Sequence, residues 1–200
     1  MRLICIGDSL TFGYGVHLSQ RWTQLCAQET GWELVNEGIN GDTTGGMLAR
    51  MQGGVLAELR EGGLGADRPY VLLMGGSNDV FYSGSDAAAR GNMGAMIHQL
   101  FSVGVLPMVG IPLPADAPHA PRAWVAAVDF EAAERTMKEY CAWLKRYCTA
   151  FGVPYIDFCA DFLSPDGSIR SELLLDGLHP TPEGHCLMAR RLSAQLKRQG

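Results

Sequence analysis

Residues 3–10 read LICIGDSL, an apolar run that passes directly into a glycine and a short polar segment. Four consecutive apolar residues are too few for a helix and are typical of a strand buried on both faces of a parallel sheet. Similar short apolar runs, each bounded by glycine, proline or polar residues, follow at residues 34–36, 70–74, 105–109 and 154–158. The pattern predicts five buried strands.

Longer segments with helical spacing lie between these runs. In residues 129–150, apolar side chains recur every three or four positions, which predicts one amphipathic helix. Further helices are expected at residues 21–29, 44–60, 88–101 and 182–197, the last with Thr181 at its N-cap and Pro182 at its first position. Strands that alternate with helices predict a doubly wound α/β sheet with helices on both faces.

The composition limits the classes of function that this protein can have. The 200 residues fit one domain, residues 1–200, and a content of 47% hydrophobic and 18% charged residues is typical of a globular protein. A net charge of -5 argues against a nucleic-acid partner, because phosphate binding requires a basic face. No apolar run exceeds five residues, so we expect no membrane span, and no signal peptide is recognised.

The six cysteines, at positions 5, 26, 141, 148, 159 and 186, form no CxxC pair and show no zinc-ligand spacing. We therefore expect reduced thiols in a reducing compartment, and a cytoplasmic protein.

Polar residues and glycines follow each predicted strand. These segments are residues 7–10, 37–46, 75–81, 110–114 and, beyond the last strand, 176–184. In open α/β sheets, ligands bind outside the carboxyl ends of the strands, so these segments hold the expected site.

Two of these segments carry candidate catalytic groups. Ser9 follows the first strand and would be a nucleophile if a base took its proton, whereas the alternative interpretation is a helix cap. Asp176 and His179 form a DxxH pair in which the carboxylate would fix the imidazole tautomer and leave Nε2 as general base. The alternative for this pair is a surface turn followed by a helix cap.

Two further residues would stabilise a developing oxyanion. The Asn78 side chain can donate from the end of the third strand, and Gly41 would bring a bare backbone N–H close to a ligand. Both are also common turn residues. The glycine-rich residues 41–46 lack the lysine of a phosphate-binding loop.

Together, these motifs resemble those of the SGNH hydrolase superfamily, the GDSL esterases and lipases. GDSL stands at residues 7–10, the glycine of the second block at Gly41, GxND at residues 76–79 and DxxH at residues 176–179. The resemblance implies a flavodoxin-like three-layer sandwich, and we expect a five-stranded parallel sheet in the order 2-1-3-4-5. It also implies serine esterase chemistry without metal or cofactor. The implied oxyanion hole consists of the Ser9 and Gly41 backbone N–H groups and the Asn78 side chain.

The expected substrate is a small-molecule ester with a short acyl group, because the loops are short apart from residues 111–124. Candidate pocket residues are Phe12, Tyr14, Val80, Phe81, Tyr82, Leu113, His119, Trp124 and Leu178. Alternatives on the same fold are a thioesterase, a lysophospholipase or a carbohydrate O-acetylesterase. Alternatives of other classes are a non-catalytic flavodoxin-like binding module and a metal hydrolase using Asp176, His179 and His185. The sequence leaves the oligomeric state open.

Overall fold

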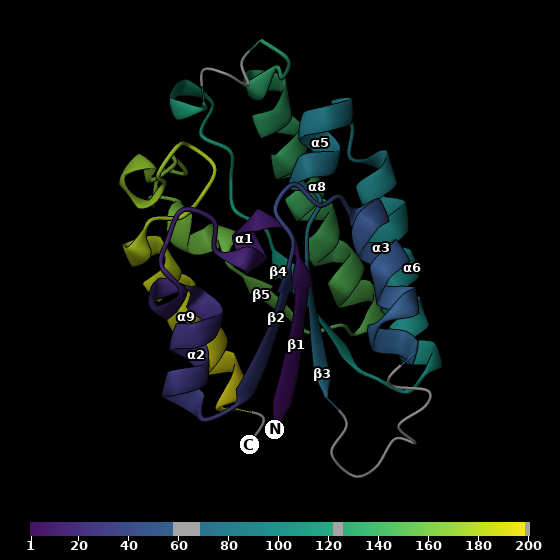
Figure 1. Ribbon diagram of the computed structural model, residues 1–200. Helices are drawn as coiled ribbons and strands as arrows, with labels where there is room; N and C mark the ends of the chain where they lie inside the picture. Colours follow the sequence, from purple (N-terminus) through teal and green to yellow (C-terminus); the bar gives the residue numbers. More distant parts are fainter. Residues whose placement is uncertain (58–68, 122–125, 199–200) are drawn as a thin grey trace.

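A computed structural model describes residues 1–57, 69–121 and 126–198. Its centre is a five-stranded parallel sheet in the order β2-β1-β3-β4-β5, as the sequence predicted (Figure 1). The strands are β1 (Arg2–Gly7), β2 (Glu33–Gly38), β3 (Tyr70–Met74), β4 (Pro107–Ile111) and β5 (Tyr155–Asp157).

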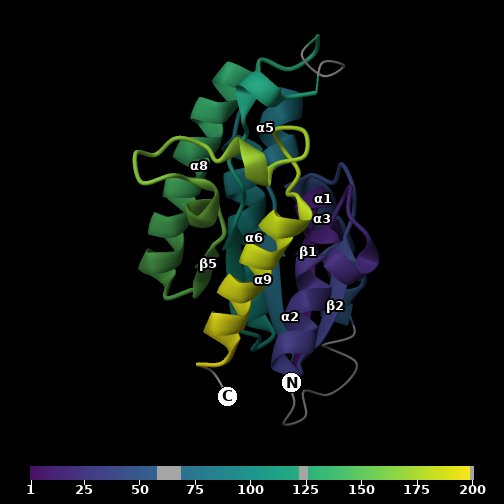
Figure 2. The same cartoon turned by 90° about the vertical axis from the view of Figure 1, so that its left-hand side faces the viewer.

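Helices cover both faces of this sheet, which makes three layers (Figures 1 and 2). One face carries α2 (Trp22–Thr30) and α9 (Pro182–Leu196). The other carries α3 (Thr44–Gly53), α6 (Ala87–Ser102) and α8 (Phe130–Phe151). Two short helices, α1 (Ser9–Phe12) and α5 (Ser77–Ser83), follow β1 and β3.

The alternation of side chains along β1 explains why its sequence is apolar throughout. Leu3 and Cys5 lie in the core beneath α2 and α9, while Ile4 and Ile6 lie in the core beneath α3, α6 and α8. Burying each large aliphatic side chain contributes about 1.5–3 kcal/mol, so both layers hold the central strand in place. The carboxyl end of β1 is thereby fixed relative to its neighbours.

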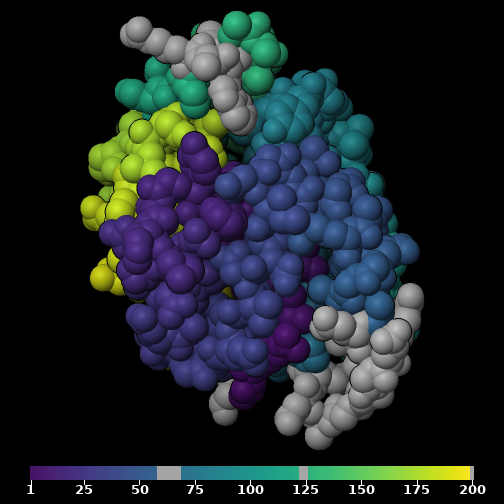
Figure 3. Space-filling model, viewed as in Figure 1, coloured from purple at the N-terminus to yellow at the C-terminus, as the bar shows by residue number. Residues whose placement is uncertain are grey.

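The first and last parts of the chain pack together. The space-filling view shows the N-terminal residues beside part of the C-terminal segment (Figure 3). Helix α2 packs against α9. An ion pair of 2.8 Å between Lys197 Nζ and Glu29 Oε1 links the ends of these helices. Within the described ranges, no helix has the length and apolarity needed to cross a membrane.

Several predicted boundaries were wrong by a few residues. The fourth strand begins at Pro107 instead of residue 105, because the Val105 N–H bonds the Leu100 carbonyl and closes the end of α6. The helix predicted at residues 44–60 is interrupted at Gly54: α3 ends at Gly53, and residues 55–57 are helical again. Residues 58–60 of that prediction lie outside the described residues.

Candidate active site

Ser9 is the first residue of α1, directly after β1. Asp8 caps this helix, since its Oδ1 accepts a hydrogen bond of 2.9 Å from the Leu10 N–H. The N–H groups of a first helical turn have no intrahelical acceptor, which leaves the Ser9 N–H available to a ligand. The tight turn requires glycine at position 7, because a Cβ there would lie 2.1 Å from the Thr11 hydroxyl oxygen.

His179 joins Ser9 to Asp176. The His179 Nε2 lies 3.0 Å from the Ser9 Oγ, and its Nδ1 lies 2.8 Å from the Asp176 Oδ2. The Asp176 Oδ1 accepts the backbone N–H groups of Leu178 and His179 at 3.1 and 2.9 Å. Burial opposes ionisation of Asp176, but the hydrogen bonds from His179 outweigh it and hold the carboxyl pKa below its ordinary value.

The turn that carries Asp176 and His179 is held in place by the loop after β4. The Asp116 N–H donates to the Gly177 carbonyl at 2.8 Å. Gly177 has a φ of +77°, and a Cβ at this position would lie 2.7 Å from both the Asp116 carbonyl oxygen and the His119 carbonyl carbon. The Tyr14 ring packs against the His179 ring with centroids 4.5 Å apart. The loop contact holds the turn, and the ring contact and the bonds to Asp176 hold the imidazole.

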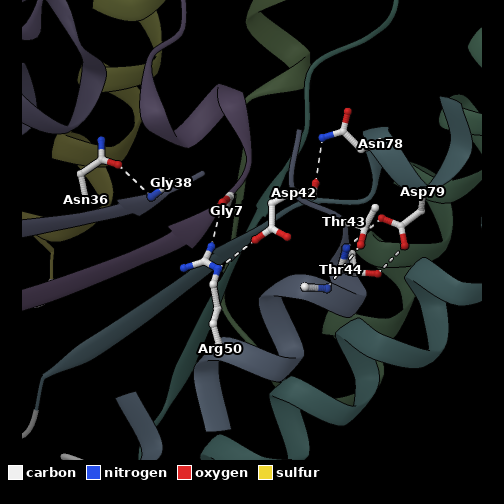
Figure 4. Close-up of polar contacts among 10 residues, drawn as sticks. Gly7, Asn36, Gly38, Asp42, Thr43, Thr44, Arg50, Asn78 and Asp79 are labelled. Carbon is white, nitrogen blue, oxygen red and sulfur yellow. Dashed lines mark hydrogen bonds and ion pairs between the residues drawn. The ribbon is translucent and has the colours of Figure 1, made fainter. Parts of the chain in front are cut away.

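Asn78 lies near the start of α5 and is buried. Its Nδ2 donates to the Asp42 carbonyl at 2.8 Å, so one amide hydrogen is engaged and the other remains available (Figure 4). Gly41, which precedes Asp42, is exposed in a turn with a φ of +76°. The two predicted oxyanion donors are thus held beside one another.

A network of hydrogen bonds and an ion pair holds the loop that carries Gly41 and Asp42 (Figure 4). The Arg50 Nε lies 2.8 Å from the Asp42 Oδ2, and its terminal nitrogen donates to the Gly7 carbonyl at 2.9 Å. Asp79 accepts the Thr44 backbone N–H at 2.9 Å and the Thr44 hydroxyl at 2.7 Å. These bonds tie β1, α3 and α5 together around the site.

The Asp8 carboxyl is completely buried behind Ser9. Its Oδ2 has no hydrogen-bond partner among the described residues. Burial raises the carboxyl pKa to about 7; the Leu10 N–H and His179 oppose this rise, and the nearby carboxyls of Asp42 and Asp79 add to it. Asp8 is therefore largely protonated below neutral pH.

A pocket of about 20 Å³ opens beside Ser9, His179 and Asn78, which is room for one water-sized group. Its lining residues are Asp8, Ser9, Leu10, Ser77, Asn78, Phe81, Leu113, Pro114, Ala115, Leu178 and His179. Three of the predicted pocket residues, Phe81, Leu113 and Leu178, line this pocket.

Among the described residues, the other predicted pocket residues do not line this pocket, although Tyr14 packs against the His179 ring. Phe12 packs beneath the Arg21 guanidinium at 4.2 Å, and Val80 is fully buried in the core. Tyr82 is exposed, and the His119 Nδ1 lies 2.9 Å from the Asp116 Oδ2. Trp124 lies outside the described residues.

Some wall residues were not predicted from the sequence. Ser77, Pro114 and Ala115 line the pocket because α5 and the loop after β4 converge on it. Their only sequence signal is that each follows a strand end.

His185, the third residue of the metal-hydrolase alternative, is engaged in the core. Its Nδ1 accepts the Trp22 N–H at 3.3 Å. Burial lowers its pKa to about 4, with smaller effects from Arg21 and His179. Among residues 1–57, 69–121 and 126–198, no group of three or more His, Cys, Asp or Glu side chains has the arrangement of a metal site.

The chain is similar to known proteins along most of its length. A profile of the GDSL-like Lipase/Acylhydrolase family matches residues 5–187. The chain belongs to this family. This GDSL-family hydrolase is 28% identical over 185 residues to Esterase TesA of Pseudomonas aeruginosa, an alignment that covers 89% of this chain and 79% of that protein. The resemblance seen in the sequence motifs is thereby confirmed.

Solved structures share the fold of this GDSL-family chain. The carbohydrate acetylesterase Est24 from Sinorhizobium meliloti has a TM-score of 0.80 at 19% identity, covering 100% of this chain and 99% of that chain. The aryl esterase from M. smegmatis has a TM-score of 0.79 at 20% identity, covering 98% of both chains. These likenesses support the three-layer α/β architecture.

Proposed function

We propose that this protein is a serine esterase that hydrolyses carboxylic esters through an acyl-enzyme. The observation that carries the proposal is the hydrogen-bonded series Ser9–His179–Asp176, with distances of 3.0 and 2.8 Å. A nucleophile, a base and an orienting carboxylate within hydrogen-bond reach form the arrangement that activates a hydroxyl group.

In the proposed mechanism, the Ser9 Oγ attacks the ester carbonyl while His179 Nε2 takes the hydroxyl proton. Asp176 holds the imidazole through Nδ1 and stabilises the imidazolium that forms. The imidazolium returns its proton to the leaving alcohol as the carbon–oxygen bond breaks. A water molecule then attacks the acyl-enzyme while His179 takes a proton from it. The bond between the acyl carbon and the Ser9 Oγ breaks, and His179 returns the proton to Ser9.

The oxyanion of each tetrahedral intermediate requires donors that are fixed in advance. We assign this role to the Ser9 N–H, the Gly41 N–H and the free amide hydrogen of Asn78. The bond from Asn78 to the Asp42 carbonyl supports this assignment, because it orients the amide before a substrate arrives.

The proposed substrates are small esters with short acyl groups. The pocket beside Ser9 is small, and its apolar walls are Phe81, Leu113 and Leu178. Short acyl groups fit such a pocket better than long chains. The six free thiols favour a cytoplasmic location for the enzyme.

Two experiments test the reaction and its substrate class. Rates for p-nitrophenyl esters of two to sixteen carbons are expected to be highest between acetyl and hexanoyl, whereas a maximum at twelve carbons or more would contradict the short-acyl assignment. Parallel assays with acyl-CoA, lysophospholipid and acetylated sugars separate the thioesterase, lysophospholipase and O-acetylesterase alternatives. Ser9→Ala is the matched inactive control in each assay.

A further inference from the structure

A second pocket lies between α8 and the segment that follows β5. It encloses about 290 Å³ and has mainly apolar walls. Two of its lining residues are cysteines from different elements, Cys141 on α8 and Cys159 at the start of the short helix η3 (Cys159–Phe162). Cys141 is buried and Cys159 is half-buried, so the pocket gives small molecules a route to Cys159.

The two thiols lie close to one another. Cys141 and Cys159 line the same pocket, and Cys159 packs against the core cluster that contains Cys141. The Cys141 Sγ also lies 3.8 Å from the Pro112 carbonyl oxygen. Two thiols that line one pocket from neighbouring elements are placed to be joined by a disulfide.

The surroundings of Cys159 lower the pKa of its thiol. The hydrogen bond from Cys141 lowers the Cys159 pKa, and this effect outweighs burial and the nearby Asp157; Lys145 lowers the pKa further. The same hydrogen bond and burial raise the pKa of Cys141, which remains a thiol. A partly exposed cysteine with a lowered pKa and a neighbouring thiol is the arrangement found in redox-sensitive cysteines.

The other cysteines have different surroundings. Cys5 and Cys26 are fully buried, and burial raises the pKa of both. Burial also raises the pKa of Cys148, to about 11. Cys186 is half-buried on α9, outside this pocket, and therefore provides a control of similar exposure.

We propose that Cys159 and Cys141 form a peroxide-sensitive dithiol that closes to a disulfide. The Cys159 thiolate attacks one oxygen of hydrogen peroxide, the O–O bond breaks, and Cys159 becomes a sulfenic acid. The departing hydroxide takes up a proton and becomes water. The Cys141 sulfur then attacks the Cys159 sulfur, the S–O bond breaks, and the leaving hydroxide carries away the Cys141 proton as a second water. Two thiols lose two electrons, and peroxide is reduced to two waters.

The test exposes the full-length reduced protein to hydrogen peroxide, blocks the remaining thiols with an alkylating reagent and maps the peptides without reduction. The expected product is a peptide pair linked through Cys141 and Cys159, with the loss of two thiols per chain. Cys159→Ser is expected to abolish the linked pair and the fast loss of thiols. Cys141→Ser is expected to leave a Cys159 sulfenic acid that dimedone captures. Cys186→Ser, the matched control, is expected to react like the wild type.

Two results would overturn the proposal. One is thiol loss in the Cys159→Ser protein as fast as in the wild type. The other is an oxidised wild type without the linked peptide pair. If Cys141→Ser fails to fold, Cys159→Ser decides alone, because its half-buried position tolerates the nearly isosteric hydroxyl.

Discussion

The Ser9 Oγ lies 3.0 Å from the His179 Nε2, although 170 positions separate the two residues in the chain. The contact depends on the packing of α2 against α9, which brings the first and last segments of the chain together. The proposed active site is therefore a product of the whole fold, and each part of it can be tested separately.

Ser9→Ala and His179→Ala should each lower kcat by several orders of magnitude. The double variant should lose little more, because a nucleophile and its base act as one unit. Ester hydrolysis by the purified variants, measured at saturating substrate, checks this. Losses that multiply in the double variant would mean that the two side chains act independently.

Asn78→Ala should lower kcat about 10²–10³-fold with little effect on KM, since one oxyanion donor acts mainly in the transition state. Asn92→Ala is the matched control. The Asn92 amide donates to the Thr44 hydroxyl at 3.1 Å, and Asn92 does not line the described walls of the pocket. An increase in KM alone for Asn78→Ala would remove Asn78 from the oxyanion hole.

Gly177→Ala should reduce both stability and kcat. Its positive φ alone costs about 1 kcal/mol for a residue with a Cβ, and here the Cβ also meets the Asp116 backbone at 2.7 Å. Gly167→Ala separates the two effects, because Gly167 has a φ of +86° and nothing within 4 Å of the added Cβ. The free energy of unfolding, measured with urea, and kcat should both fall more in Gly177→Ala than in Gly167→Ala. Equal losses of unfolding free energy in Gly177→Ala and Gly167→Ala would mean that the contact between Asp116 and Gly177 does not stabilise the protein.

The buried Asp8 should make stability fall as pH rises. Burial raises its folded pKa from 3.8 to about 7, so the folded state binds more protons than the unfolded state between these values. Its stabilising effect is complete below pH 3.8 and is lost as pH rises through about 7. His185 acts in the opposite direction, since its folded pKa is lowered from 6.5 to about 4.

Comparison of wild type with Asp8→Asn isolates the Asp8 contribution, because the amide keeps the oxygen that accepts the Leu10 N–H. The difference in unfolding free energy between the two proteins should change by about 1.4 kcal/mol per pH unit across the steepest part of the window. Urea unfolding from pH 4 to 8 measures this. A difference that does not change with pH would mean that folding does not raise the pKa of Asp8.

The sequence predicted where the strands end, and it located Ser9 and Asn78 just after β1 and β3, but it located Asp176 and His179, which lie well beyond β5, only through their DxxH spacing. It missed α5, since a seven-residue helix such as Ser77–Ser83 is too short to show a helical period. Val80 and Phe81 show a second limit. They are adjacent, yet only Phe81 lines the pocket, because side-chain direction depends on the phase of that unpredicted helix.

Contacts between loops and between distant elements had no sequence signal. The clamp between Asp116 and Gly177 joins two loops, and the pairing of Cys141 with Cys159 joins α8 to η3. Both depend on how the helical layer is placed on the sheet, which no local pattern encodes.

Covalent labelling tests the central claim most directly. A fluorophosphonate reacts only with an activated serine, and peptide mapping locates the adduct. We predict one adduct per chain, on Ser9, that is absent from Ser9→Ala and forms far more slowly in His179→Ala. An adduct on another residue, or ester hydrolysis that persists undiminished in Ser9→Ala, would contradict the assignment of Ser9 as the nucleophile.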